Sequence, residues 1–289
     1  MKPASQPALD VVLVRPRNPL NIGSVARAMA NFGLEHLSVV DAYEPHWREA
    51  RTAVDAEDLL QSARALPTLA EAVAQATLVI GTGSLTYRKP EQEVVQLPEL
   101  APRVRRELAS GGQIALVFGP EKHGLTREDL SWCHILVEIP TSPRQPSMNL
   151  AQAVAVSLYE LSTRALANPW TNALAAQPAP TSEPAREPAQ ETVPESALQS
   201  PELVAPDSPS ADATSGSATP AAKPASSELD RLANLIEEAM AAARYSPAHM
   251  RPANQHDLRL MLRRLQFNTH DLRRALGLFR RILWRIGRQ

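Results

Sequence analysis

Short apolar runs alternate with stretches of helical spacing across residues 1–167 of this 289-residue chain. The runs that resemble buried strands are Leu9–Val14, Leu37–Val40, Leu78–Ile80, Ile114–Phe118 and Ile135–Ile139. The helical stretches include Ile22–Phe32, Ala50–Leu66 and Leu69–Ala76. Because parallel strands are joined through crossover helices, this alternation predicts an α/β domain with a Rossmann-like parallel sheet covered by helices.

The first predicted strand leads into a loop and a helix over Asn21-Ile22-Gly23-Ser24-Val25-Ala26-Arg27-Ala28-Met29. We expect Asn21 to be the N-cap of this helix, and Gly23 to let backbone or ligand approach closely. An apolar stripe recurs at helical spacing and consists of Val25, Met29 and Phe32. Arg27 lies off this stripe, which places its guanidinium within reach of a ligand over the strand ends.

Two loops follow predicted strands, at Gly81–Ser84 and Gly119–Glu121, where parallel α/β sheets bind ligands. Neither is a dinucleotide fingerprint or a phosphate-binding loop. The single cysteine, Cys133, excludes an internal disulfide and a cysteine-based metal cage, and no metal is expected. The chain has no run of about 18 apolar residues, and Met1–Pro7 lacks the apolar core of a signal peptide. A cytoplasmic protein without membrane contact is therefore expected.

Residues 168–227 differ in composition from the rest of the chain. They hold 11 of the 26 prolines, and Trp170 is their only aromatic residue. Such a segment cannot bury enough apolar surface to offset the entropy of ordering it, so we predict a disordered Pro/Ala-rich linker. A role as a proline-rich ligand is the alternative, although no repeated P-x-x-P core with basic flanks is present.

Helical spacing returns from Glu228 onward, and predicts a small all-helical domain of three helices over residues 228–289. The near-neutral chain has an uneven charge: residues 1–167 carry 16 Lys and Arg against 18 Asp and Glu, residues 168–227 carry 2 against 7, and residues 228–289 carry 12 against 6. A basic C-terminal unit on a linker favours contact with nucleic acid. The candidate phosphate contacts are Arg263, Arg264, Arg273, Arg274, Arg280 and Arg281, and the alternative is that they are solvated helix faces.

Three segments together resemble the SPOUT superfamily of RNA ribose 2′-O-methyltransferases, in particular its TrmH/TrmJ group. They are the Asn-x-Gly-x-x-x-Arg pattern at residues 21–27, the segment Val117–Thr126, and Ile139-Pro140 followed by Ser147–Val154. Weaker similarity in Leu262–Leu265 and Leu278–Leu283 narrows the resemblance to the TrmJ type of tRNA enzyme. The three motifs occur in the order that they have in the family.

This resemblance implies a fold, a cofactor and a substrate. The fold is a sheet whose segment from about Gly81 to Leu161 is threaded into a trefoil knot, which no pattern rule would predict. The reaction is S-adenosylmethionine-dependent methylation of a tRNA ribose 2′-hydroxyl, at cytidine or uridine 32 of the anticodon loop. The family also implies a homodimer in which Arg27 of one subunit faces the cofactor held by the other.

The resemblance also assigns roles to residues. The catalytic set is Arg27, Asn21, Ser147 and Asn149, and the cofactor loops supply Thr82, Gly83, Ser84, Gly119, Ile139, Pro146, Ser147 and Met148. A guanidinium stays protonated in proteins, so Arg27 is expected to orient the hydroxyl and stabilise developing negative charge; acting as a base would need a second group.

Each assignment has a structural alternative. The cofactor loops can be ordinary strand-end turns, Ser147 and Asn149 can be caps of the following helix, and Arg27 can form a surface salt bridge. Thr126 and Asp129 are predicted only as a capping box. For the whole chain, the rivals are the same reaction on ribosomal RNA or another tRNA site, and an RNA-binding module without catalysis.

Overall fold

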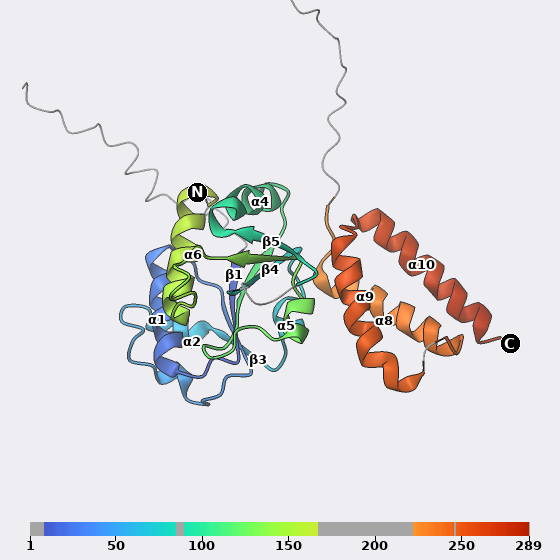
Figure 1. Cartoon of the computed structure of the whole chain (residues 1–289), viewed down its shortest axis with the longest axis horizontal. Helices are drawn as coiled ribbons and strands as arrows, with labels where there is room; N and C mark the ends of the chain where they lie inside the picture. The colour runs from blue at the N-terminus through green and yellow to red at the C-terminus, as the bar shows by residue number, and fades with distance from the viewer. Residues whose placement is uncertain (1–8, 85–89, 167–221, 246, 289) are drawn as a thin grey trace, which may run out of the picture.

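A seven-stranded parallel sheet forms the centre of the larger unit, residues 9–166, which we call the sheet domain (Figure 1). The computed structural model describes residues 9–84, 90–166, 222–245 and 247–288. The strands are β1 (Leu9–Val14), β2 (Leu37–Val40), β3 (Arg64–Leu66), β4 (Leu78–Thr82), β5 (Glu93–Gln96), β6 (Ile114–Phe118) and β7 (Ile135–Glu138). They lie in the order β3-β2-β1-β6-β4-β7-β5, and every neighbouring pair is parallel, which confirms the predicted α/β class.

The central strands are buried on both faces. In β1, Leu9, Val11 and Leu13 point into one core and Val12 and Val14 into the other. A strand buried on both sides reads as a continuous apolar run, which is why β1 and its neighbour β6 could be predicted.

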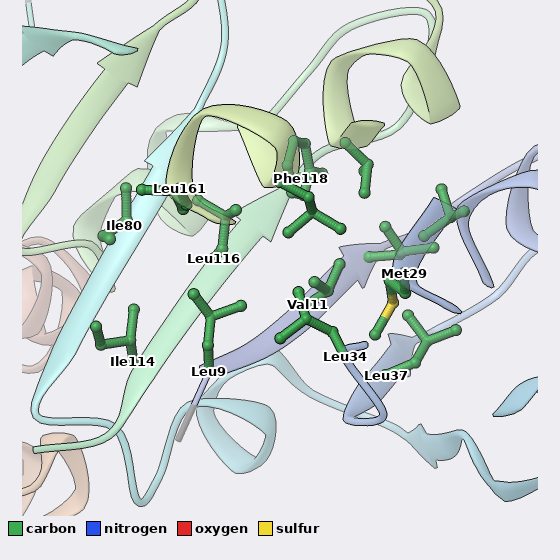
Figure 2. Packing of buried hydrophobic residues seen from close by; sticks show 14 of the residues in the cluster. Leu9, Val11, Met29, Leu34, Leu37, Ile80, Ile114, Leu116, Phe118 and Leu161 are labelled. Atoms are coloured by element: carbon green, nitrogen blue, oxygen red, sulfur yellow. The ribbon is translucent and has the colours of Figure 1, made fainter. Parts of the chain in front are cut away.

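Helices cover the two faces of the sheet. They are α1 (Pro19–Asn31), α2 (Glu57–Ser62), α3 (Leu69–Ala72), α4 (Leu97–Ala109), α5 (Arg127–Ser131) and α6 (Leu150–Arg164). Helices α1, α4 and α6 fill the larger core, where Met29 and Leu161 pack over β1, β4 and β6 (Figure 2). Helices α3 and α5 close the smaller core on the opposite face.

Helix α1 begins earlier than predicted. Asn18, not Asn21, is its N-cap: the Asn18 Oδ1 accepts the N–H of Leu20 at 3.0 Å, and Pro19 occupies the first helical position. Proline suits that position because its missing N–H would have no partner there. Asn21 therefore lies inside the first turn, and its amide group is available for contacts outside the helix.

Residues 50–66 do not form the single predicted helix. The chain instead forms the 3-10 turn η1 (Trp47–Glu49), the short helix α2 and the edge strand β3. Arg64 in β3 donates to the Ser38 hydroxyl at 2.8 Å and pairs with Asp10. These partners are distant in sequence, so local spacing could not reveal the strand. The predicted helix Leu69–Ala76 likewise ends at Ala72, and β5 and α4 were not predicted.

A smaller unit of three helices, which we call the helical extension (residues 222–288), lies beside the sheet domain (Figure 1). It consists of α8 (Ser226–Ala242), the 3-10 turn η2 (Ala248–Met250), α9 (Arg251–Arg264) and α10 (Thr269–Ile286). Its core is formed by Leu229, Leu232, Ala233, Leu262, Leu272 and Leu276. The three predicted helices are present, but α8 begins at Ser226, before the predicted boundary at residue 228.

The start of the extension is attached to the sheet domain. The backbone N–H groups of Ser226 and Ser227 donate to the carbonyl oxygens of Ala76 and Ala74 at 2.9 and 3.0 Å. The Lys223 ammonium donates to the buried Glu107 carboxylate at 2.6 Å. Residues 222–227, predicted as part of the linker, are therefore a docking segment; the rest of the predicted linker lies outside the described residues. No helix in the described ranges is long and apolar enough to cross a membrane.

Candidate functional site

A hydrogen-bonded chain of three side chains connects the three sequence motifs at the carboxyl ends of the strands. The Asn21 Nδ2 donates to Glu121 Oε1 at 2.8 Å, and the Asn149 Nδ2 donates to Asn21 Oδ1 at 3.0 Å. Asn21 comes from α1, Glu121 from the loop after β6, and Asn149 is the N-cap of α6, where its Oδ1 accepts the N–H of Ala151 at 2.9 Å. Asn149 is thus both a cap, as predicted, and a link between motifs.

Glu121 is the acceptor at the centre of this arrangement. Besides the Asn21 amide, its carboxylate accepts the backbone N–H groups of Arg17 and Asn18 at 3.0 and 3.2 Å. Partial burial opposes the charge on Glu121, but these hydrogen bonds outweigh it and lower the pKa of the carboxyl below its usual value of 4.5. An ionised Glu121 therefore holds the loop before α1 against the loop after β6.

A cavity of about 280 Å³ opens beside this chain, over the ends of β4, β6 and β7. Its lining includes every residue that the sequence analysis assigned to the cofactor: Thr82, Gly83, Ser84, Gly119, Ile139, Pro146, Ser147 and Met148. Glu121, Lys122 and His123 also line it, as do Leu125 and Leu130 on its apolar side. Three loops that are far apart in sequence are therefore brought around one cavity.

Two glycines shape the cavity in different ways. A Cβ on Gly119 would lie 2.2 Å from the backbone nitrogen of Leu125, so only glycine lets the loop between β6 and α5 fold this closely on itself. A Cβ on Gly83 would meet no atom of the other described residues within 4 Å. Among the described residues, the space beside Gly83 is therefore open to a ligand in the cavity.

The lining fits S-adenosylmethionine by its chemistry. The apolar wall of Phe118, Leu125, Leu130 and Met148 can cover an adenine ring, and the loop backbones around Gly83 and Gly119 carry the N–H and C=O groups that recognise its edge. Thr82 is not free for this role through its hydroxyl, because Oγ1 donates to the Val117 carbonyl at 3.0 Å.

The predicted catalytic residues are only partly assembled within one chain. Asn21 and Asn149 are bonded to each other and Ser147 lines the cavity, but Arg27 is exposed on α1 and does not line the cavity. The Arg27 side chain forms no ion pair or hydrogen bond with another described residue, so the described residues do not support the alternative of a surface salt bridge. Its guanidinium is available to a second molecule.

The six predicted phosphate contacts fall into three groups. Arg273, Arg274, Arg280 and Arg281 are exposed on α10, and none forms an ion pair with a described residue. The Arg264 side chain is half exposed, and its guanidinium nitrogen lies 3.5 Å from a carboxylate oxygen of Glu91. For Arg263 the prediction is wrong: its side chain is only 1% exposed, and its guanidinium donates to Asp230 at 3.0 Å and to the Trp132 carbonyl at 3.1 Å.

The sequence analysis did not predict the cavity residues Leu125, Leu130 and Thr141, or the contacts of Arg259 described below. Alternating apolar spacing does not distinguish a residue that lines a cavity from one in the core.

The capping box of Thr126 and Asp129 is confirmed, with the Thr126 Oγ1 accepting from the Asp129 N–H at 3.1 Å. Burial raises the pKa of the Cys133 thiol to about 12, so this thiol is unreactive. Among the described residues no cluster of three metal-ligating side chains occurs.

We expect replacement of Glu121 by Gln to lower the free energy of unfolding by on the order of 1 kcal/mol at pH 7, because an amide offers one acceptor oxygen where the carboxylate offers two. The lowered pKa means that this contribution is present above the usual pKa of 4.5 and is lost as the pH falls through the lower folded value. Urea unfolding of both proteins between pH 7 and pH 3 measures it. Equal pH dependence in Glu121→Gln and the unmodified protein would contradict this role.

The chain is similar to proteins of known class. The sequence model of the SpoU rRNA Methylase family matches residues 8–159. The tRNA (cytidine/uridine/adenosine-2′-O-)-methyltransferase TrmJ of Pseudomonas aeruginosa is 41% identical over 154 residues, which are 53% of this chain and 60% of that protein. The tRNA (cytidine-2′-O-)-methyltransferase TrmJ of Methanocaldococcus jannaschii is 39% identical over 165 residues, 55% of this chain and 70% of that protein.

The matched region thus spans about 60% of the length of the Pseudomonas relative. Among solved structures, TrmJ from Z. mobilis ZM4 is similar with a TM-score of 0.67 and 25% identity, over 94% of this chain and 98% of that one. That likeness extends over the helical extension as well as the sheet domain. Because the family model covers more than half of the chain, and its match agrees with the resemblance carried by the three motifs, this protein belongs to the SpoU rRNA methylase family.

Proposed function

We propose that this protein is an S-adenosylmethionine-dependent methyltransferase that methylates the 2′-hydroxyl of a tRNA ribose. The observation that carries the proposal is the cavity over β4, β6 and β7, because it gathers all eight residues that the motifs assign to the cofactor. Relatives that are 41% and 39% identical over the sheet domain are named as tRNA 2′-O-methyltransferases, which supports the reaction and the substrate class.

The loops around Gly83, Gly119 and Ser147 would hold the cofactor in this proposal. When bound, S-adenosylmethionine supplies a methyl group activated by its sulfonium. The protein contributes an apolar wall, where Leu125 and Leu130 exclude water. It also contributes a fixed frame, because Glu121 and Asn149 hold the first turn of α1. Such a frame orients the ribose oxygen without reorganisation during the reaction.

Arg27 supplies the remaining charge. Its guanidinium keeps its proton, so it donates hydrogen bonds to the ribose oxygen and stabilises the negative charge that develops there. The hydroxyl proton leaves to another acceptor, such as a phosphate of the RNA. Because Arg27 does not line the cavity of its own chain, we propose that it serves the cavity of a second subunit.

A homodimer is supported by the face on which Arg27 lies. Helices α1 and α6 run side by side and parallel, as the Asn21–Asn149 bond near their starts and the Phe32–Tyr159 ring contact near the end of α1 show. Besides the exposed Arg27, helix α1 exposes Leu20 by 51%, and α6 exposes Val156 by 37% and Tyr159 by 59%. Exposed apolar side chains on two neighbouring helices are typical of an interaction surface.

We propose tRNA as the substrate and cytidine or uridine 32 of the anticodon loop as its target, as the TrmJ-type motifs imply. In this proposal the exposed arginines of α10, which are Arg273, Arg274, Arg280 and Arg281, supply the phosphate contacts. Ribosomal RNA is the second candidate, because the matching family is described as rRNA methylases. We also infer the trefoil knot of the family over about Gly81–Leu161, supported by the way the three cavity loops enclose one space.

Mapping of 2′-O-methyl groups tests this function. In a strain that lacks the gene, we expect the methyl group at position 32 of the anticodon loop to be lost, and to return when the unmodified gene is supplied. The Gly83→Val variant should fold normally, because a Cβ there meets no atom of the other described residues within 4 Å, but should not restore methylation, because its side chain fills the cavity. Loss of a methyl group from ribosomal RNA with position 32 intact would reject tRNA as the substrate.

Heterodimers test the shared site. We expect a heterodimer of an Arg27→Ala subunit and a Gly83→Val subunit to keep about half the activity of the unmodified dimer, since one site pairs an open cavity with an intact arginine. A heterodimer of an unmodified subunit and a subunit with both substitutions should be inactive. Differently tagged subunits, co-expressed and purified over both tags, provide the two samples. The reverse pattern of activity would place each site within one subunit.

Substitution of three exposed arginines tests the RNA contacts. We expect Arg273→Gln, Arg280→Gln and Arg281→Gln together to weaken tRNA binding and to reduce the slope of log affinity against log salt by up to about 2.7, at roughly 0.7 to 0.9 per lost phosphate contact. Binding of S-adenosylmethionine should not change, because the cavity lies in the sheet domain. An unchanged slope together with loss of the dimer would make α10 an assembly element instead.

A further inference from the structure

Two arginines of α9 join the helical extension to the end of helix α5. We call this set of contacts the α5 clamp: Arg259 and Arg263 of α9 hold Glu128, Ser131 and Trp132. The Arg259 Nε donates to the Ser131 hydroxyl at 3.1 Å, and its guanidinium pairs with Glu128. The guanidinium carbon of Arg259 lies 4.7 Å from the centre of the Trp132 ring, and that of Arg263 lies 5.3 Å from it.

The two arginines of the clamp are shielded from solvent, whereas Glu128 is 59% exposed. The Arg259 side chain is 13% exposed and the Arg263 side chain 1%. Charge pairs and cation–π contacts are stronger where water is excluded, and removal of one partner leaves the other buried without compensation. Two arginines that are one helical turn apart thus hold a tryptophan of the sheet domain.

The same short helix forms part of the cofactor cavity. Leu130 of α5 lines the cavity, and so does Leu125, two residues before the helix begins. The clamped residues Glu128 and Ser131 are therefore within three residues of the cavity wall along the chain. A helix of five residues is not stable by itself, so its position depends on the contacts that surround it.

Contacts within the sheet domain hold the other parts of α5. Asp129 pairs with Arg15 after β1 and caps the helix together with Thr126. Gln92 donates to the carbonyl of Leu130 at 2.5 Å. The end of α5 at Ser131 and Trp132, in contrast, has α9 as its neighbour. The extension is therefore placed to decide where the apolar wall of the cavity lies.

We propose that Arg259 is a positioning residue for the cofactor: by holding α5, it sets the cavity wall formed by Leu125 and Leu130, and it couples the helical extension to cofactor binding. This inference rests on the proposed function. Since a coupling free energy between two sites is reciprocal, cofactor in the cavity also tightens the docking of α9 on α5. RNA held by α10 and cofactor held over the sheet then favour the same docked arrangement.

The affinity of the full-length protein for S-adenosylmethionine, measured by calorimetry, tests the proposal. We expect Arg259→Ala to weaken binding roughly five- to fiftyfold, within the range of typical coupling between sites. Arg251→Ala is the matched control, because Arg251 is also on α9 but pairs with Glu237 of α8 and not with α5. The affinity of this variant for S-adenosylmethionine should equal that of the unmodified protein. Arg259→Lys keeps the charge but not the fork-shaped contact with Ser131 and Glu128, so it should recover only part of the affinity.

A second measurement reads the coupling in the opposite direction. Amide hydrogen exchange in α9 should slow when S-adenosylmethionine is added to the unmodified protein, and should not respond in Arg259→Ala. If Arg259→Ala does not fold, Glu128→Gln is the second variant. It removes the same ion pair by changing the exposed partner, and it should also weaken binding of S-adenosylmethionine.

The outcomes separate this inference from the proposed function. If the unmodified protein does not bind S-adenosylmethionine, the proposed function fails. If it binds, and the folded Arg259→Ala or Glu128→Gln variant binds with the same affinity, the positioning role of Arg259 is wrong and the methyltransferase assignment stands.

Discussion

The arrangement of the site depends on the hydrogen bonds that the carboxylate of Glu121 accepts. It accepts hydrogen bonds from the Asn21 amide and from two backbone N–H groups of the loop before α1. Asn21 in turn accepts from Asn149 at the start of α6. Asn21 is thereby joined to partners 100 and 128 residues further along the chain, and each of the three segments carries one of the sequence motifs. A single charged acceptor is effective here because its hydrogen bonds favour the ionised state.

The parallel sheet makes this contact geometrically possible. Parallel strands place all their carboxyl ends at one edge, so the loops after β1, β4, β6 and β7 meet there whatever their distance in sequence. Gly119 then allows the loop after β6 to fold back on its own residues 124–125. Gly83 leaves the space beside it open among the described residues. The cavity is a consequence of strand order and of two positions without a side chain.

The helical extension is part of the same structure and not a separate unit carried on a linker. Its first residues bond to the carbonyls of Ala74 and Ala76, and α9 holds the end of α5 through Arg259 and Arg263. Of its arginines, Arg259, Arg263 and Arg264 on α9 contact the sheet domain, whereas Arg273, Arg274, Arg280 and Arg281 on α10 are exposed. The basic composition of the segment therefore serves two purposes, docking and a free cationic surface, and only the three-dimensional packing distinguishes them.

By itself the sequence determined the α/β class, the central strands and the helical character of the extension, and its motifs, through the family resemblance, identified eight of the residues around the cavity. Strands such as β1 and β6 are buried on both faces and read as apolar runs, and the cofactor loops sit directly after strands. The tertiary structure alone decided that Asn18 and not Asn21 caps α1, that Arg64 lies in a strand, and that Arg263 is buried against Asp230 and Trp132. In each case the deciding partner is distant in sequence. Local patterns report which face of an element is apolar, but they do not report which polar groups the fold brings into contact.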